Sequence, residues 1–156
     1  MDSKKLAFKL AALALNKKAE DIKILDLRKI TPIADFFVIC TANSEPQVKA
    51  IANEILVGAK NEGENVWHKE GTNMKSWVLL DFIDVVVHVF LRDTRGFYSL
   101  EKLWGDAEIT DITDEAPQGK LAKKIKKEPK VVKPKVVKKA SVKKPRATAK
   151  KNIKKK

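Results

Sequence analysis

Few residues of this chain are of the types that carry out catalysis or bind metal ions. Asp81 and Asp84 could form a metal-binding carboxylate pair, but they stand three positions apart between two apolar runs. Acidic residues at such a spacing are typical of a tight turn, where their side chains accept backbone hydrogen bonds. We therefore interpret the pair as turn residues and expect neither catalysis nor a metal ion there.

The other chemical candidates are one cysteine and two histidines. Cys40 ends an apolar run without an obvious activating partner, so we expect a buried, inert thiol. A single cysteine cannot form an intramolecular disulfide, and His68 and His88 leave little room for a histidine-rich metal site. The sequence contains neither a P-loop nor a G-x-G-x-x-G motif. The residues alone therefore give few signals of catalysis or of cofactor binding.

The charge of the chain divides it into two parts. Its 156 residues carry 33 Lys and Arg and 20 Asp and Glu, for a formal net charge of +13. Residues 1–116 have a net charge of −4, whereas residues 117–156 contain 18 basic side chains and one acidic, a net charge of +17. The whole-chain value suggests a nucleic-acid-binding protein, but the division indicates a mildly acidic domain that carries a basic tail.

Apolar periodicity predicts an alternation of helices and strands. Residues 3–18 are apolar around most of a helix circumference, which indicates a helix buried on several sides or one that also contacts a second chain. A second helix is expected over residues 44–62, because Ser44 and Gln47 form an S-x-x-Q capping box. The expected strands cover residues 21–28, 36–41, 65–70, 76–82 and 85–91, and a short last helix capped by Ser99 covers 100–104.

This order predicts a single α/β domain in which helices cover a mixed five-stranded sheet. We place the domain at residues 1–110 and a disordered, lysine-rich tail at residues 111–156. The basic segment holds four of the six prolines and no aromatic residue, a composition that cannot form a packed core. We expect no membrane-spanning helix, since no run of 18 apolar residues occurs, and without a secretory signal we expect a reducing, cytoplasmic location.

The two runs around Asp81 and Asp84 predict a hairpin with two different faces. If Leu80 pairs with Val85 and Trp77 with His88, alternate residues share a face. The aliphatic face consists of Val78, Leu80, Val85, Val87 and Val89, and the aromatic face consists of Trp77, Leu79, Val86, His88 and Phe90. Helices should pack on the aliphatic face. The aromatic face is either an exposed recognition patch or is covered by a further helix, with His88 as a core histidine.

Five motifs in one order carry a family resemblance. They are Ile33–Ile39 (IADFFVI), Ser44 with Gln47–Ala52 (QVKAIA), Trp77–Asp81 (WVLLD), Asp84–Phe90 (DVVVHVF) and Phe97–Asp106 (FYSLEKLWGD). With them the chain resembles the ribosomal silencing factor family, RsfS, also called Iojap, over roughly residues 3–107. The resemblance implies a small α/β fold similar to that of nucleotidyltransferases, without the catalytic carboxylate signature of those enzymes.

The resemblance also implies a function. Members of this family bind the large ribosomal subunit at its subunit-joining face, through the fourteenth protein of the large-subunit series. They thereby block the small subunit sterically and repress translation, and organelle relatives assist assembly of the large subunit. The resemblance thus implies binding and exclusion by a protein that is not an enzyme and has no cofactor. We expect the ribosomal-protein contact on and near the aromatic face, at Trp77, Leu79, Asp81, Asp84, His88, Phe90, Tyr98, Leu100 and Trp104. Acidic side chains there, Glu101 included, would meet basic groups of the partner.

The tail lies outside the resemblance, and its composition alone suggests contact with phosphate backbones. We expect it to lie on ribosomal RNA through Lys123, Lys124, Lys126, Lys127, Lys138, Lys139, Lys143 and Lys144, with a merely solubilising tail as the alternative. Other readings of the chain are a large-subunit assembly factor, a nucleotidyltransferase-like enzyme and a DNA-compacting protein. The free protein could also form a homodimer through its patch or its first helix.

Overall fold

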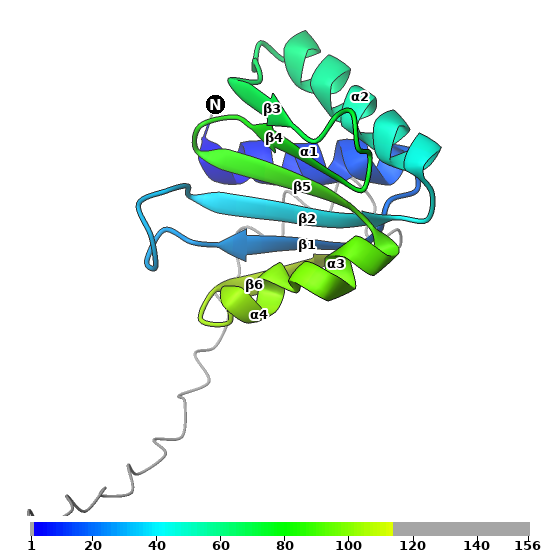
Figure 1. Ribbon diagram of the computed structural model, residues 1–156. Helices are drawn as coiled ribbons and strands as arrows, with labels where there is room; N and C mark the ends of the chain where they lie inside the picture. The colour runs from blue at the N-terminus through cyan, green and yellow to red at the C-terminus, as the bar shows by residue number, and fades with distance from the viewer. Residues whose placement is uncertain (1, 114–156) are drawn as a thin grey trace, which may run out of the picture.

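The computed structural model describes residues 2–113 and forms one mixed α/β domain (Figure 1). Its elements alternate in the predicted manner, with additions near the C-terminal end. They are α1 Ser3–Asn16, β1 Glu20–Asp26, β2 Phe36–Ala42, α2 Glu45–Asn61, β3 His68–Glu70, β4 Trp77–Asp81, β5 Val85–Leu91, α3 Arg92–Tyr98, α4 Leu100–Leu103 and β6 Glu108–Ile112. Residues 114–156 of the expected tail, with the RNA-contacting lysines, lie outside the described residues, whereas residues 111 and 112 belong to β6.

The sheet has six strands in the order β3-β4-β5-β2-β1-β6. β2 and β5 are parallel, and the other neighbours in the sheet are antiparallel. The predicted five-stranded sheet was wrong by one strand, because β6 is a short edge strand with mostly exposed residues and lacks a clear apolar pattern. The expected domain boundary at residue 110 falls inside β6, whose pairing with β1 reaches Ile112.

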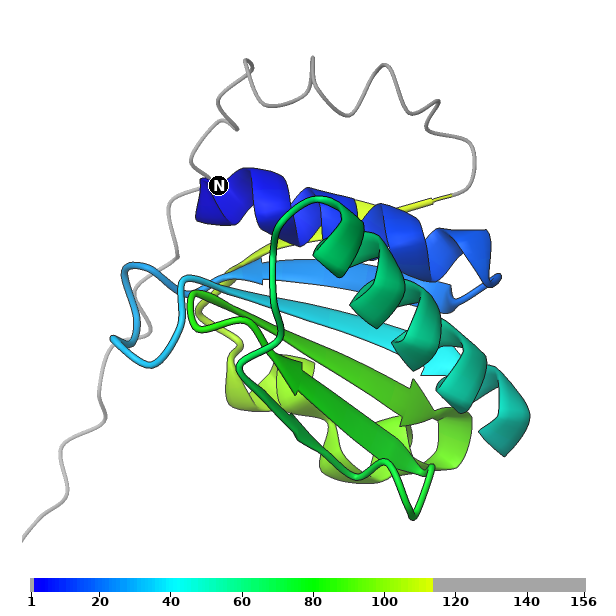
Figure 2. The ribbon, with the colours of Figure 1, turned by 90° about the horizontal axis from the view of Figure 1, so that it is seen from above.

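Helices α1 and α2 cover one side of the sheet, and α3 and α4 lie on the other (Figure 2). The cover by α1 and α2 is built from their apolar stripes, of which Leu10, Ile51 and Ile55 are fully buried. Ser44 caps α2 as predicted, since its Oγ accepts the Gln47 N–H at 3.4 Å. These helices and the aliphatic face of the hairpin belong to one buried cluster, which is the main core of the domain.

The hairpin register differs by two residues from the predicted one. Trp77 lies opposite Phe90, and Leu80 lies opposite Val87. A shift of two residues keeps every side chain on the same side of the sheet, because the side-chain period of a strand is two. The aliphatic and aromatic faces are therefore composed as predicted.

The connection after β5 was predicted incompletely. α3 was missed, because Arg92–Tyr98 is a two-turn helix with polar and aromatic residues and no apolar stripe. Ser99 does not cap α4 with its side chain; it ends α3 in the left-handed conformation, at φ 45° and ψ 53°. Its Oγ donates instead to the Gly96 carbonyl at 2.7 Å. We call residues 92–104, the two short helices and the bend between them, the elbow.

Candidate functional site

The aromatic face is partly covered by the elbow. Leu100 and Trp104 of the elbow pack on a second buried cluster, to which Phe37, Val86 and Phe90 belong. Phe90 is fully buried and His88 is 4% exposed. The alternative in which a further helix of the same chain covers this face, with His88 in the interior, therefore holds for its centre.

Aromatic side chains from β4, β5 and the elbow are in contact across this face. The Trp77 ring stacks on Phe90 with centroids 4.8 Å apart, and the Tyr98 ring lies 4.7 Å from that of Trp77. Phe97 adds an edge-to-face contact with Tyr98 at 5.1 Å. Ring pairs in these geometries contribute about 0.5–1.5 kcal/mol each beyond their burial. Trp77 of β4 and Phe97 and Tyr98 of the elbow thus form a continuous set of rings, which we call the aromatic surface.

His88 is held in one tautomer beneath this surface. The Trp77 indole N–H donates to His88 Nδ1 at 3.2 Å, and because an indole nitrogen only donates, Nδ1 is the acceptor. Burial lowers the pKa of His88 to about 4, so the ring is neutral at pH 7 and its proton is on Nε2. Among the described residues, Nε2 is the one buried side-chain nitrogen or oxygen without a hydrogen-bond partner.

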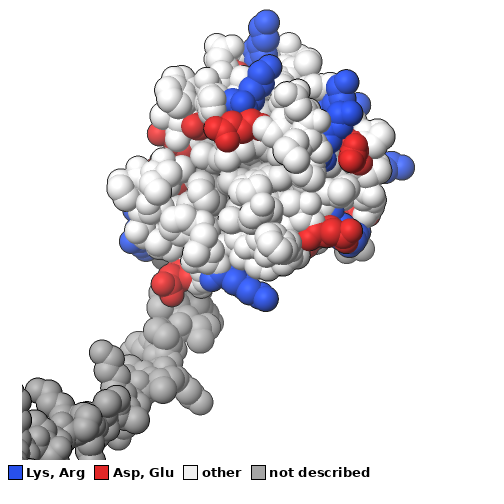
Figure 3. All heavy atoms as spheres, in the orientation of Figure 1, with Lys and Arg blue, Asp and Glu red and all other residues white. Residues whose placement is uncertain are grey.

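The rim of the aromatic face is open to solvent. Phe97 is 82% exposed and Tyr98 is 49% exposed. Large aromatic side chains that are exposed next to one another often mark an interaction site. Trp77, Leu79, Leu100 and Trp104 are half-buried between this rim and the interior. In the space-filling view of this side the central area is uncharged and charged side chains surround it (Figure 3). Such an arrangement is typical of a protein-docking surface.

A hollow opens beside the elbow at the start of β4. Its volume is about 580 Å³, and its apolar lining comes from Met74, Trp77, Phe97 and Tyr98. Met74 is 79% exposed in the loop before β4. Sequence reasoning named neither Met74 nor Phe97 as a contact residue; Phe97 stood in a family motif, whereas Met74 carries no local signal. The exposed aromatic surface is thus larger than the predicted one.

The nine predicted contact residues therefore occupy different depths. Trp77, Leu79, Tyr98, Leu100 and Trp104 lie together at or just below the surface. His88 and Phe90 lie beneath it, where both are buried and in contact with Trp77.

Asp81 and Asp84 flank the hairpin turn. The Asp81 carboxylate accepts the Ile83 N–H at 2.7 Å, and the Asp84 N–H donates to the Phe82 carbonyl at 3.0 Å. The interpretation of this pair as turn residues is confirmed. In residues 2–113 no group of three His, Cys, Asp or Glu could hold a metal ion, and no helix there is long and apolar enough to cross a membrane.

Cys40 lies inside β2 and is fully buried, as predicted. Burial raises the pKa of its thiol to about 12, so the thiolate needed for reactivity is absent at neutral pH.

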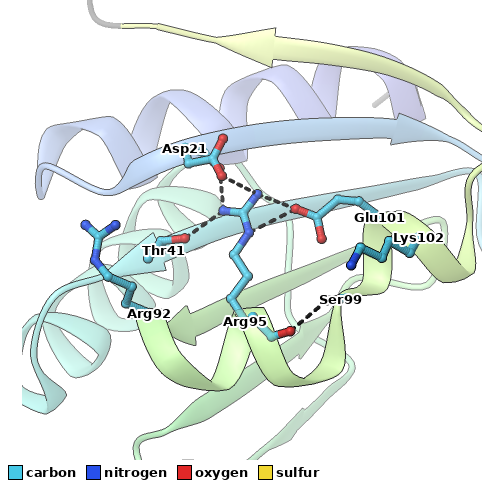
Figure 4. A pocket seen from close by; sticks show the side chains of 8 residues that line it. Asp21, Thr41, Arg92, Arg95, Ser99, Glu101 and Lys102 are labelled. Carbon is cyan, nitrogen blue, oxygen red and sulfur yellow. Dashed lines mark hydrogen bonds and ion pairs between the residues drawn. The ribbon is translucent and has the colours of Figure 1, made fainter.

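A second hollow, of about 380 Å³, lies on the other side of α3 (Figure 4). Asp21, Thr41, Arg92, Arg95, Gly96, Ser99, Glu101 and Lys102 line it. Arg95 and Glu101 are joined at its base by two hydrogen bonds, of 2.9 and 2.5 Å. Sequence reasoning missed Arg95 altogether, since its partners are scattered over the chain.

Comparison with known proteins points to one family. A family model described as "Ribosomal silencing factor during starvation" matches residues 1–151. The ribosomal silencing factor RsfS of Bacillus subtilis is 50% identical over 111 residues, which are 70% of this chain and 94% of that protein. The chloroplastic protein Iojap of Zea mays is 40% identical over 109 residues, which cover 68% of this chain and 46% of that protein.

Solved structures agree with these sequence matches. A crystal structure of a Chromobacterium violaceum protein superposes with a TM-score of 0.66 at 34% identity, covering 74% of this chain and 97% of that one. A crystal structure from Bacillus halodurans gives a TM-score of 0.62 at 40% identity, covering 70% and 99%. The predicted α/β class is confirmed by these neighbours.

Proposed function

Since the chain belongs to the ribosomal silencing factor RsfS family, which includes the Iojap proteins, we propose that it binds the large ribosomal subunit through its aromatic surface. The contact would be made with the fourteenth large-subunit ribosomal protein, at the face where the small subunit docks. Occupation of that face blocks subunit joining and lowers translation, so the protein acts in the cytoplasm by binding and exclusion, without catalysis.

One observation carries this proposal: large aromatic side chains are exposed together at the margin of a sheet face. The Tyr98 ring contacts those of Phe97 and half-buried Trp77, and Phe97 and Tyr98 are exposed to solvent in the isolated domain. Aromatic residues at such a position are the usual anchors of protein interfaces, and their truncation to alanine causes the largest losses of binding free energy. The uncharged centre with its charged rim has the anatomy of an interface as well.

The charges of the chain suit a ribosomal partner. Residues 1–116 carry a net charge of −4, which favours approach to a basic ribosomal protein. The tail, with a net charge of +17 over residues 117–156, would lie on neighbouring ribosomal RNA and raise the association rate. Specificity then comes from the domain, and part of the affinity comes from the tail. A homodimer of the free protein would use the same aromatic surface.

The test is co-sedimentation of the full chain with isolated large subunits. We expect Trp77→Ala and Phe97→Ala to weaken binding at least about tenfold, because both remove anchors of the surface. Val57→Ala is the matched control, since Val57 is an exposed apolar residue of α2 on the opposite side of the sheet. Circular dichroism checks that each variant is folded. Binding that Trp77→Ala and Phe97→Ala leave at the level of Val57→Ala would refute the surface assignment.

The contribution of the tail is measured with a chain that ends at residue 113. Its affinity should be lower, and log K should fall less steeply with log salt, because fewer phosphate contacts release counterions. Equal binding of the truncated and full chains at every salt concentration would show that the tail has another role. Small subunits added to the mixture report whether binding prevents subunit joining.

A further inference from the structure

Arg95 is the one charged side chain among residues 2–113 that is buried, with 7% of its surface exposed. Charged groups are almost never buried unless they are fully paired, because removing a charge from water is costly. Arg95 stands in a two-turn surface helix, where its side chain could have pointed into solvent without a desolvation penalty. Its burial therefore calls for an explanation in terms of what it holds together.

The guanidinium group of Arg95 contacts three elements outside its own helix (Figure 4). Nε and one terminal nitrogen donate to Oε1 of Glu101 in α4, at 2.9 and 2.5 Å. The other terminal nitrogen donates to the Asp21 carbonyl of β1 at 2.5 Å and to Thr41 Oγ1 of β2 at 2.7 Å. The Asp21 carboxylate forms an ion pair with Arg95, with Oδ2 3.0 Å from the terminal nitrogen that also bonds to Glu101. All donor nitrogens of Arg95 thus have partners.

The backbone is distorted at both ends of this set of contacts. The pairing of β1 with β2 shifts register between Glu20 and Lys23, and Asp21 within that irregularity has a φ of 45°. Ser99, between the residues that supply the guanidinium and its Glu101 partner, also has a φ of 45°. For residues other than glycine, this left-handed conformation is less stable than the right-handed one by about 1–2 kcal/mol. Such distortions persist where the surrounding contacts outweigh them, and here those contacts are made by Arg95.

The charge state of Glu101 matches its role as a partner. Partial burial acts to raise its pKa, but its own backbone N–H and the Arg95 guanidinium stabilise the carboxylate more strongly, so its pKa is lowered. The pair is therefore charged at pH 7. Glu101 has 21% of its side chain exposed, against 9% for the Arg95 side chain, so the bond lies just below the surface.

The elbow, which Arg95 joins to the sheet, supplies Phe97 and Tyr98 of the aromatic surface. Phe97 and Tyr98 follow Arg95 within the same helix, and the ring of Tyr98 rests 4.7 Å from that of Trp77 in β4. On the far side of the bend, Leu100 and Trp104 supply the apolar contact with the sheet. Movement of α3 would separate Phe97 and Tyr98 from Trp77, while the main core under α1 and α2 would be unaffected.

We propose that Arg95 is a positioning residue for ribosome binding: its guanidinium latches the elbow to β1 and β2 and so holds Phe97 and Tyr98 beside Trp77 as a single docking surface. The binding part of this inference rests on the proposed function. The latch itself is a property of the free domain and can be measured without ribosomes.

The test uses hydrogen–deuterium exchange and large-subunit binding of the full chain. Arg95→Met removes the charge but keeps an unbranched apolar side chain, and Glu101→Gln removes the charge of one partner. We expect amides in residues 92–104 to exchange at least about tenfold faster in Arg95→Met, with no change in β2 and β5. Lys102→Met is the matched control, because it makes the same change from a basic to an unbranched apolar side chain at an exposed position of the elbow.

Binding distinguishes positioning from a general structural role. Arg95→Met should weaken large-subunit binding about tenfold, and Phe97→Ala should cost far less in that background than in the unmodified chain, because the ring is already displaced. Additive losses would overturn the positioning role.

Unchanged exchange of the elbow in a folded Arg95→Met chain would overturn the latch, whether or not subunits bind. If Arg95→Met does not fold, Glu101→Gln decides: faster exchange confined to residues 92–104 supports the latch, and unchanged or uniformly faster exchange overturns it. If the unmodified chain does not bind large subunits, the proposed function fails, and the exchange data still decide on the latch.

Discussion

The two sides of the β4–β5 hairpin have opposite kinds of cover. The aliphatic face lies under α1 and α2, helices of 14 and 17 residues, and its valines and leucine are almost completely buried. The aromatic face lies under the elbow, whose two helices have 7 and 4 residues. A short cover buries the centre of the face but not its rim. The first side therefore supplies most of the buried core, and the second leaves apolar surface exposed to solvent.

The polar groups of the two sides follow the same division. The cluster under α1 and α2 is apolar throughout, whereas the aromatic side contains His88 and the nearby Arg95 latch. The bond from Trp77 to His88 Nδ1 and the contacts of Arg95 are directional, so each specifies one arrangement of its neighbours. The elbow leaves much of its apolar area exposed, so directional bonds add to the packing of Leu100 and Trp104 in holding it, whereas α1 and α2 are held by buried apolar area.

The largest difference between the faces should appear in two adjacent leucines of β4. Leu80 points to the aliphatic face and is fully buried, whereas Leu79 points to the aromatic face and is half-buried. We expect Leu80→Ala to lower the free energy of unfolding by about 2–5 kcal/mol and Leu79→Ala by about 1 kcal/mol. Urea unfolding measures both. Equal losses would mean that the aromatic face is as much a core as the aliphatic one.

A smaller effect should appear in the pH dependence of stability. The pKa of His88 is lowered to about 4 in the folded domain, so the unfolded chain takes up a proton first as the pH falls. The stabilisation from neutral His88 is complete above about pH 6.5. It is lost between there and pH 4, with a slope of up to about 1.4 kcal/mol per pH unit.

His88→Gln should flatten this slope, since an amide oxygen can still accept the Trp77 N–H but does not titrate. His68→Gln, which removes an exposed imidazole in β3, is the matched control. Unfolding curves recorded between pH 4.5 and 7.5 give the comparison. A slope that survives in His88→Gln would place its origin outside the aromatic face.

The smallest effect concerns the turn that joins the two strands. Ile83 has a φ of 74° in a turn closed by the bond from Asp84 N–H to the Phe82 carbonyl, and its side chain is 63% exposed. Ile83→Gly removes this strain and should raise the free energy of unfolding by about 0.5–1 kcal/mol, after the entropic cost of glycine. Ile33→Gly, at an exposed isoleucine without positive φ, should give no such gain. Weaker subunit binding by Ile83→Gly would extend the docking surface to the turn.

Much of the fold could be predicted because its signals are local. The capping box at Ser44 and the run of valines in β5 are read within a few residues, and both form as expected. The hairpin register was off by two, yet the faces were right, because the alternation of side chains depends on parity alone. β6 and α3 were missed, because an edge strand and a two-turn helix need little apolar patterning.

By itself, the sequence determined the α/β class, the contrast in net charge between residues 1–116 and residues 117–156, and which side chains of the hairpin share a face. Composition and periodicity suffice for these properties. Only the tertiary structure decided how deep each aromatic residue lies and what holds the elbow. The partners of Arg95 at Thr41 and Asp21 are 54 and 74 residues away, so no local pattern contains the latch. Burial depth likewise depends on which segment folds back over a face, and that is set by such long-range contacts.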